Sequence, residues 1–262
     1  MNRNEVKMNH KIRVLLAGES WVSNSTHYKG WDFFSSTIYE VGIQYLKESL
    51  EGTNIELIHL PGHLVADHFP STLDELNSYQ VLILSDIGSN TLLLPSDVWL
   101  RGKRSVNRLQ LIQDWVSRGG GFAMCGGYYS FAGIYASAKY YRTPIEEILP
   151  VNILTFDDRV ECPQGVNPVI IDSTHLIVKN VPEPWPYLLG YNDLSLKPGS
   201  HLIATIQDKP LLAVTSHGKG KTLAWASDIG PHWCPDEFVK WEGYRLLWKQ
   251  IITWLAKGES NE

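Results

Sequence analysis

The chain has only three cysteines among its 262 residues, Cys125, Cys162 and Cys234. They are too few and too scattered for a disulfide framework, so the simplest expectation is a cytoplasmic protein with reduced thiols. No apolar run reaches the roughly 18 residues that a membrane helix needs. The segment from Met1 to Lys11 is polar and lacks the apolar core of a signal peptide. The sequence therefore predicts no membrane partner and no export.

The chain also lacks an excess of positive charge. Its net charge is −5 and its charges are dispersed, which gives no electrostatic footprint for nucleic acid. Gly220-Lys221-Thr222 resembles the tail of a phosphate loop, but Thr215 stands where the first glycine should be. One group of possible metal ligands fits no strong spacing and is better interpreted as a solvated loop: His59, His63, Asp67 and His68. We therefore expect a small-molecule ligand, and neither a cofactor nor a metal.

Apolar residues are plentiful instead, at 44% of the chain, and ten are tryptophans. A substantial core follows from this composition. Some tryptophans are expected to line a pocket or to cover an interface in a homo-oligomer, two alternatives that the sequence leaves open. No linker, repeat or low-complexity tract divides the chain, so residues 1–262 are predicted to form a single domain.

Apolar runs and helical periodicities alternate through the first half of the chain. This β-α-β-α order predicts a mainly parallel sheet with helices on both faces. The expected strands are Ile12–Gly18, Ile55–Leu60, Val81–Ser85 and Phe122–Met124; the expected helices are 38–50, a short one at 73–76, and 106–116. Three segments complete this half: loops at Glu19–Phe34 and Pro61–Pro70, and a helix at Phe131–Tyr141.

The second half is richer in strands and turns. Strand-like runs are separated by proline and glycine, and His217-Gly218-Lys219-Gly220 is typical of a hairpin turn. The expected elements are a short helix at 144–149, strands at Pro168–Ile171, Leu202–Ile206, Leu211–Ser216 and Thr222–Ala226, and a last helix at Lys240–Ala256. The sequence thus predicts an α/β fold with an additional β-rich C-terminal part.

The most suggestive stretch runs from Gly119 to Phe131 and contains Cys125 between an apolar strand and a glycine pair. A strand, a tight turn and a helix capped by Ser130 would form a nucleophile elbow, with cysteine as the nucleophile. The helix N-terminus would lower the pKa of the thiol and the bend would expose it. The alternative is that Cys125 is small and buried, and that the glycines only shape a turn.

A thiol nucleophile needs a base, and His232 is the candidate. It lies on the loop that follows the strand Thr222–Ala226, and its ring would be oriented by one of three acids, Asp228, Asp236 or Glu237. Backbone N–H groups at Gly126 and around Gly88 would then form an oxyanion hole.

Several polar residues are expected at the same sheet edge, because they follow strand ends: Glu19, His27, Lys29, Asp86 and Tyr128. Together with tryptophans they predict a small-ligand pocket. The acidic segment Asp157-Asp158-Arg159-Val160-Glu161 has two interpretations, a clamp for sugar hydroxyls or, more simply, internal ion pairing around Arg159.

These motifs, taken together, resemble a known family. The chain is similar to the "putative glutamine amidotransferase" family of bacterial cytoplasmic proteins, within the class I glutamine amidotransferase-like superfamily. The matching segments are Gly18-Glu19-Ser20-Trp21, His27-Tyr28-Lys29-Gly30, Ser85-Asp86-Ile87-Gly88-Ser89-Asn90, Gly126-Gly127-Tyr128, 157–161 and Pro231-His232-Trp233. The resemblance implies a flavodoxin-like three-layer αβα fold and covers nearly the whole chain.

What the resemblance implies for activity stays open between two functions. One is a cysteine-dependent hydrolase of an amide or related substrate, with Cys125, His232 and Glu237 as its catalytic residues. The other is a non-catalytic protein that binds a small ligand, such as a carbohydrate, at Glu19, His27, Lys29, Asp86, Gly88, Gly126 and Tyr128. The chain departs from the G-x-C-x-G and H-x-E motifs of active amidotransferases, since Ala123 replaces the first glycine and Cys234 the glutamate.

Overall fold

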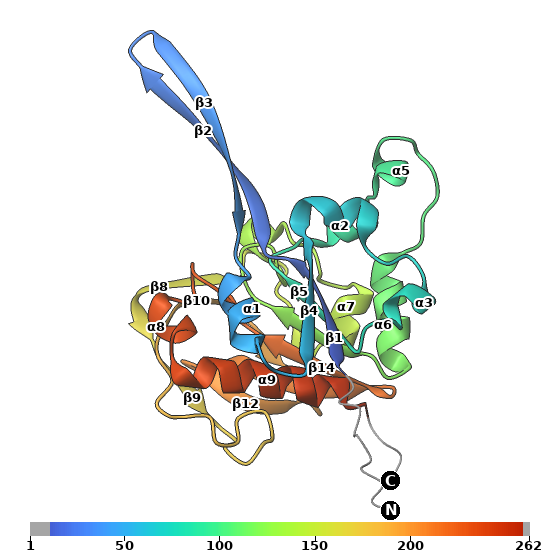
Figure 1. Cartoon of the computed structure of the whole chain (residues 1–262), viewed down its shortest axis with the longest axis vertical. Coiled ribbons are helices and arrows are strands. Elements are labelled where there is room, and N and C mark those ends of the chain that lie inside the picture. Colours follow the sequence, from blue (N-terminus) through green and yellow to red (C-terminus); the bar gives the residue numbers. More distant parts are fainter. Residues whose placement is uncertain (1–10, 259–262) are drawn as a thin grey trace, which may run out of the picture.

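The computed structural model describes residues 11–258, so nearly all of the polar segment in which we predicted no signal core lies outside the described residues. An eight-stranded sheet forms the centre, in the order β4-β1-β5-β6-β14-β13-β12-β9 (Figure 1). The first five of these strands are parallel and the last three pair antiparallel. The strands are β1 (Ile12–Gly18), β4 (Ile55–Pro61), β5 (Val81–Ser85), β6 (Gly121–Cys125), β9 (Pro168–Ile170), β12 (His201–Ile206), β13 (Lys209–His217) and β14 (Gly220–Trp225).

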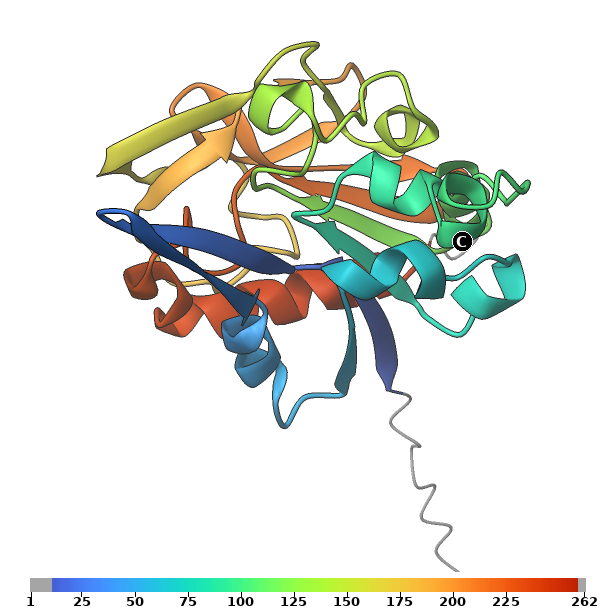
Figure 2. The ribbon, with the colours of Figure 1, turned by 90° about the horizontal axis from the view of Figure 1, so that it is seen from above.

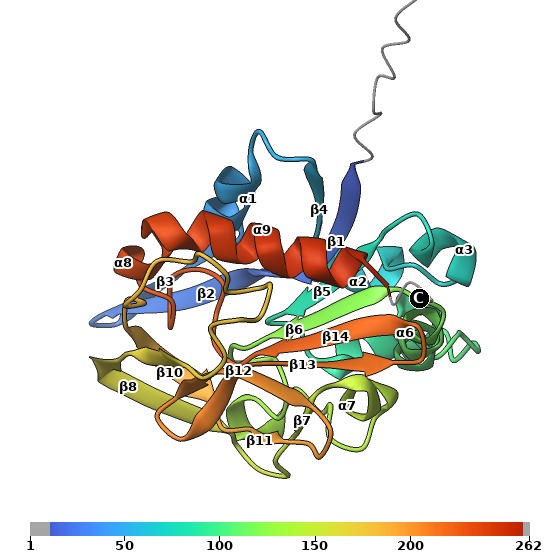
Figure 3. The ribbon, with the colours of Figure 1, turned by 90° about the horizontal axis from the view of Figure 1, so that it is seen from below.

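Helices cover both faces of this sheet, which gives three layers (Figures 2 and 3). The long helix α9 (Glu242–Ala256) packs on one face beside α1 (Gln44–Leu50), and α6 (Arg108–Ser117) packs on the other beside α7 (Pro144–Ile148). The shorter helices are α2 (Gly62–His68), α3 (Leu73–Leu76), α4 (Ser89–Leu93), α5 (Ser96–Trp99) and α8 (Asp236–Val239). Within the described part of the chain, every helix falls short of the length and apolarity needed to cross a bilayer.

The buried strands show why the parallel part was predictable. Every residue of β5 and β6 is buried, as expected for central parallel strands with both faces covered. Helix α6 begins where the side chain of Asn107 accepts the backbone N–H groups of Leu109 and Gln110. Helix α9 buries an apolar stripe of Tyr244, Leu247, Trp248, Ile251 and Leu255.

The β-rich part follows the prediction in outline. Strands β13 and β14 form the expected antiparallel hairpin around Gly218. Two small antiparallel pairs were not predicted: β8 (Arg159–Val166) with β10 (Leu188–Asn192), and β7 (Val151–Asn152) with β11 (Ser195–Leu196).

Three local predictions were wrong. The expected loop at 19–34 and the first turns of the helix at 38–50 are an antiparallel hairpin, β2 (Ser20–Lys29) with β3 (Asp32–Val41), which projects from the body (Figure 1). The expected loop at 61–70 contains helix α2. The expected helix at 131–141 is an irregular segment with one 3-10 turn at Ile134–Ala136, and positive φ angles such as 53° at Phe131 and 59° at Lys139 prevent a helix there.

Candidate functional site

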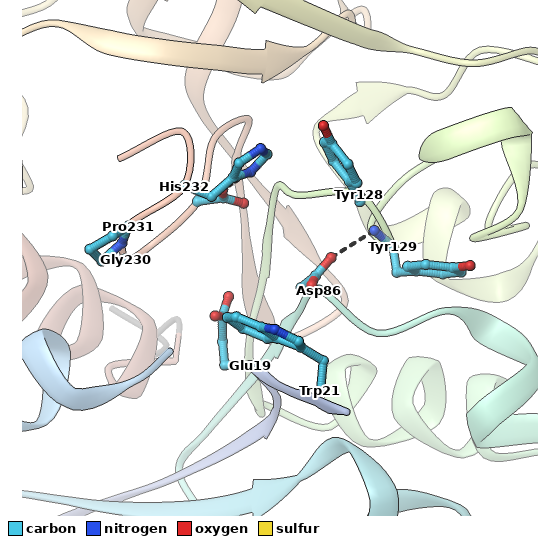
Figure 4. Close-up of a pocket in the computed structure, with 9 residues that line it drawn as sticks. Glu19, Trp21, Asp86, Tyr128, Tyr129, Gly230, Pro231 and His232 are labelled. Atoms are coloured by element: carbon cyan, nitrogen blue, oxygen red, sulfur yellow. Dashed lines mark hydrogen bonds and ion pairs between the residues drawn. The ribbon is translucent and has the colours of Figure 1, made fainter. Parts of the chain in front are cut away.

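The carboxyl ends of four adjacent parallel strands meet at one edge of the sheet. Gly18, Ser85, Cys125 and Trp225 lie in one register row across β1, β5, β6 and β14. The residues that follow these strand ends surround a cavity of about 370 Å³ (Figure 4). It is lined by Glu19, Trp21, Asp86, Tyr128, Tyr129, Asp228, Gly230, Pro231 and His232. A cavity thus lies at the predicted edge of the sheet, the position where open α/β sheets bind ligands.

Two acidic residues on the cavity floor are held in an unusual backbone conformation. Glu19 follows β1 with φ of 48°, and Asp86 follows β5 with φ of 46°. Non-glycine residues rarely adopt this left-handed region, and such strain concentrates at functional sites. Gly18 makes the approach possible, because a Cβ atom there would lie 1.9 Å from the carbonyl oxygen of Ser85. The backbone therefore turns both carboxyl groups toward the same cavity (Figure 4).

Burial raises the pKa of both carboxyl groups. Glu19 is only 5% exposed, and burial raises its pKa well above the ordinary value, as do the nearby charges of Asp86 and Asp228. Burial likewise raises the pKa of Asp86 from 3.8 to about 6, with a further contribution from Asp228. Each of these carboxyls therefore keeps its proton to a higher pH than an ordinary carboxyl does, and while protonated it can donate a hydrogen bond.

His232 lies at the rim and is oriented by Asp228. Its Nδ1 atom lies 3.0 Å from Oδ2 of Asp228, which also accepts the backbone N–H of Trp233. This hydrogen bond raises the pKa of the imidazole. Of the three acids that the sequence offered, Asp228 is thus the orienting group. Our choice of Glu237 was wrong: that residue lies on α8 and its carboxylate interacts with Tyr187.

Aromatic rings form the walls. The ring of Tyr128 meets that of His232 edge-on at 4.7 Å, and Trp21 and Tyr129 complete the lining. Glu161 fixes two of the rings by accepting hydrogen bonds from Tyr128 Oη at 3.0 Å and from Trp233 Nε1 at 2.9 Å. The site therefore combines apolar walls with a polar floor, as small-ligand pockets do.

Cys125 does not have the exposure or the acidity that we predicted. It is the last residue of β6, its side chain is fully buried, and burial raises its pKa well above the ordinary value, with Glu19 contributing further. The thiol does not line the cavity. Ser85 connects the two groups, because its hydroxyl contacts the thiol and donates to Glu19 Oε1 at 2.5 Å. A carboxyl-bearing residue thus occupies the floor, and the thiol lies in the core behind it.

The expected oxyanion hole is also missing at Gly126. Its N–H donates to the carbonyl oxygens of Trp225 and Ser227 at 2.8 and 2.9 Å. The N–H of Gly127 donates to Asn192, and that of Tyr129 donates to Asp86 at 2.8 Å. These N–H groups are thus already hydrogen-bonded to acceptors of the protein itself and do not form an oxyanion hole. No helix follows the turn, since Ser130 instead accepts the N–H of Asp86 and donates to Gly126.

Three other predicted ligand-binding residues lie elsewhere. His27 and Lys29 are near the tip of the β2–β3 hairpin, where His27 stacks on Phe34, and neither lines the cavity. Gly88 packs beneath Tyr129: a Cβ atom on it would lie 3.3 Å from that ring. The sequence placed His27 and Lys29 in a loop at the strand end, whereas the hairpin carries them away from it.

The acidic segment at 157–161 follows its simpler interpretation. Asp157 forms an ion pair with Arg159 at 2.8 Å, and Asp158 is buried and accepts the N–H groups of Ala132 and Gly133. Among the described residues, no group of three or more His, Cys, Asp or Glu side chains is arranged to hold a metal ion.

Sequence reasoning did not commit to Trp21, Tyr129, Pro231 or Asp228 as site residues. A signal for them existed, because each lies within six residues of the carboxyl end of a parallel strand. Asp228 was named only as one of three alternatives, since a loop sequence does not show which acid reaches the histidine.

The fold and the cavity define an α/β protein with a mainly parallel sheet and a cavity at the carboxyl edge of that sheet. The chain belongs to the family described as "Putative glutamine amidotransferase", whose model matches residues 13–257. No curated protein matches it.

Solved structures agree with this membership. The chain is 39% identical to "Cytoplasmic Protein STM3548" from Salmonella typhimurium, with a TM-score of 0.90 over 92% of this chain and 98% of that one. It is 42% identical to "Cytoplasmic Protein STM1381" from Salmonella typhimurium LT2, with the same TM-score over 94% and 100%. A "thua-like" protein from Parabacteroides merdae shares the fold alone, at 12% identity and a TM-score of 0.53 over 96% and 93%.

Proposed function

We propose that the cavity at the carboxyl edge binds a small, neutral, polyhydroxylated molecule of the carbohydrate class. The observation that carries this proposal is the pairing of a carboxyl floor, Glu19 and Asp86, with the aromatic walls of Trp21, Tyr128 and Tyr129. Carboxyl groups form hydrogen bonds with the hydroxyl groups of a sugar, and aromatic faces pack against the apolar side of its ring.

The charges of the site support a neutral ligand. Burial raises the pKa of both floor carboxyls and so disfavours their charged forms, and Asp228 adds a further acceptor for ligand hydroxyls. An anionic ligand would face these carboxyls without a cationic partner among the residues that line the cavity, apart from a protonated His232. Phosphorylated compounds are therefore poor candidates.

A proton-transfer reaction on the bound molecule is a second candidate, favoured by the His232–Asp228 pair. An imidazole oriented by a carboxylate at 3.0 Å is the usual arrangement of a general base. In this reaction His232 exchanges a proton with a ligand hydroxyl, and Asp228 stabilises the charged ring.

The cysteine-dependent hydrolase is the less supported alternative. In it, Cys125 attacks an amide carbonyl and His232 accepts the thiol proton, which requires the thiol to reach the cavity. Burial, a raised pKa and the Glu19–Ser85 contact all oppose this.

We also propose that the fold is of the flavodoxin-like, class I amidotransferase-like type, and that the protein is cytoplasmic like its named relatives.

The test is a thermal-shift screen of neutral sugars and polyols, with sugar phosphates, amines and glutamine in parallel. A bound sugar at a hundred times its Kd adds about 2.7 kcal/mol of stability. This gain should be lost in Trp21→Ala and retained in Cys125→Ala. Stabilisation by amines or phosphates alone would overturn the ligand class. Ammonia release from glutamine that disappears in Cys125→Ala would establish the hydrolase instead.

A further inference from the structure

The β2–β3 hairpin, residues Ser20–Val41 and here called the arm, is a long two-stranded ribbon. Ten residue pairs run from Ser20–Val41 at the root to Lys29–Asp32 near the tip. It is fixed at its root, where Gly42 N–H donates to the carbonyl oxygen of Glu19 and Gly62 N–H donates to Ser20 Oγ at 2.7 Å. Beyond its root the arm projects away from the sheet and helices (Figure 1).

The tip of the arm carries large aromatic side chains that contact little else. Trp31 is fully exposed, Tyr28 is 77% exposed and Phe33 is 68% exposed, and Phe34 is more than half exposed. Such a cluster is unusual for a surface that faces only water, because large exposed apolar patches mark interaction sites.

The register places these residues on both faces of the ribbon. Since directly paired residues share a face, one face carries Tyr28 with Phe33, and the other carries His27 with Phe34. Neither face has a core to cover it. An isolated two-stranded ribbon is at best marginally stable in water, and its open edges invite pairing. The arm therefore has the features of a segment that is covered in an assembly.

The exposed area is the right size for a protein interface. Each aromatic side chain has about 150–250 Å² to bury. At the observed exposures, Ile38, Val22 and the aromatic residues of one arm other than Trp21 offer about 650–1,000 Å². A standard interface buries about 800 Å² per partner.

The charges of the arm favour a second copy of this chain. Lys29 and Asp32 face each other across the strands near the tip, so the tip has no net charge to attract a nucleic acid or an anionic lipid surface. In a two-fold contact, Lys29 of one arm can lie against Asp32 of the other. The middle of the arm carries small side chains that permit close approach of another chain: Ser23, Asn24, Ser25, Thr26, Ser35, Ser36 and Thr37.

We propose that the β2–β3 arm is the surface through which two copies of this chain associate, each arm burying its aromatic tip against the other copy. This contact is independent of the ligand proposed for the cavity, since the tip residues do not line it.

Light scattering after size exclusion, at about 1–100 μM, measures the association directly. The full chain should have at least twice the monomer mass of 29.7 kDa. The double variant Trp31→Ser/Phe33→Ser should weaken association by about thirtyfold or more, the effect of losing interface hot spots. Both residues are exposed, so the fold should be unchanged by circular dichroism.

The matched control is Trp99→Ser, which removes a tryptophan that is 72% exposed on α5, away from the arm, and should leave the mass unchanged. A wild-type monomer across the whole range would overturn the proposal, as would a double variant that associates over the same concentrations as the wild type. A wild-type monomer that instead sediments with neutral phosphatidylcholine vesicles would assign the arm to a lipid surface.

Discussion

The reactivity of the Cys125 thiol is limited by its depth in the sheet. Because it ends a strand flanked by β5 and β14, its neighbours are other strands and not solvent. Iodoacetamide should therefore label Cys125 in the native protein at least about a hundredfold more slowly than in the unfolded chain, since reaction requires local opening. Mass spectrometry of labelled peptides measures this, with the buried Cys234 as internal control. Rapid labelling of Cys125 alone near pH 7 would restore the nucleophile hypothesis.

Asp86 gives stability an unusual pH dependence. Its folded pKa of about 6 lies above the ordinary 3.8, so its favourable contribution is fully present below pH 3.8 and is lost as pH rises through about 6. The unfolding free energy of Asp86→Asn minus that of wild type should therefore increase by about 2–3 kcal/mol as the pH rises from 4 to 7. Denaturant unfolding at several pH values checks this.

The control for this prediction has the opposite sign. The pKa of Asp157 is lowered by its hydrogen bonds to Arg159, so its contribution is present above pH 3.8 and is lost on acidification. Asp157→Asn should therefore destabilise the protein most at neutral pH. Parallel pH profiles for the two variants would contradict the assignment.

The acid that orients His232 can be identified by titration. Asp228→Asn should lower the imidazole pKa, because the hydrogen bond from Nδ1 to Asp228 is the main cause of its elevation. Glu237→Gln should leave it unchanged. The ring proton of His232 followed by NMR across pH 5–8 measures both, and an equal shift in the two variants would mean that no single acid orients the ring.

At the scale of elements, the close approach of the β6 and β14 loops depends on Gly126. A Cβ atom there would lie 2.6 Å from Asn192 Oδ1 and 2.8 Å from the backbone of Ala226 and Ser227. Gly126→Ala should cost about 1–3 kcal/mol by overpacking. Gly199→Ala, where a Cβ atom meets nothing within 4 Å, should cost only the positive-φ strain of about 1 kcal/mol. Chemical denaturation compares them, and equal losses would refute a packing role for Gly126.

Elements that pack on the core could be predicted from the sequence, and those that leave it could not. Val81–Leu84 and Phe122–Met124 are continuous apolar runs, so their strands could be predicted directly. Ile38 and Val41 fit helical spacing with Tyr45, yet they belong to β3. Their pairing with β2 is a contact between segments, which periodicity along one segment does not record.

The same distinction explains the site. Strand order alone brought Glu19, Asp86, Tyr128 and His232 to one edge, and all four line the cavity. The depth of Cys125 and the orientation of His232 could not be inferred, because they depend on how β5, β6 and β14 lie in register. Cys125 is therefore one residue too deep, and Asp228 rather than Glu237 reaches the imidazole.

For the whole molecule, the arm links assembly to stability. If two copies bury their arms against each other, the native state gains free energy with protein concentration by mass action, about 1.4 kcal/mol of dimer for each tenfold increase. For a chain of this length the melting temperature should rise by about 1–3 °C per tenfold. Differential scanning calorimetry of wild type and of Trp31→Ser/Phe33→Ser at matched concentrations separates association from folding. The variant should show the rise only at concentrations about thirtyfold higher, and a concentration-independent wild type would show that the arms stay uncovered.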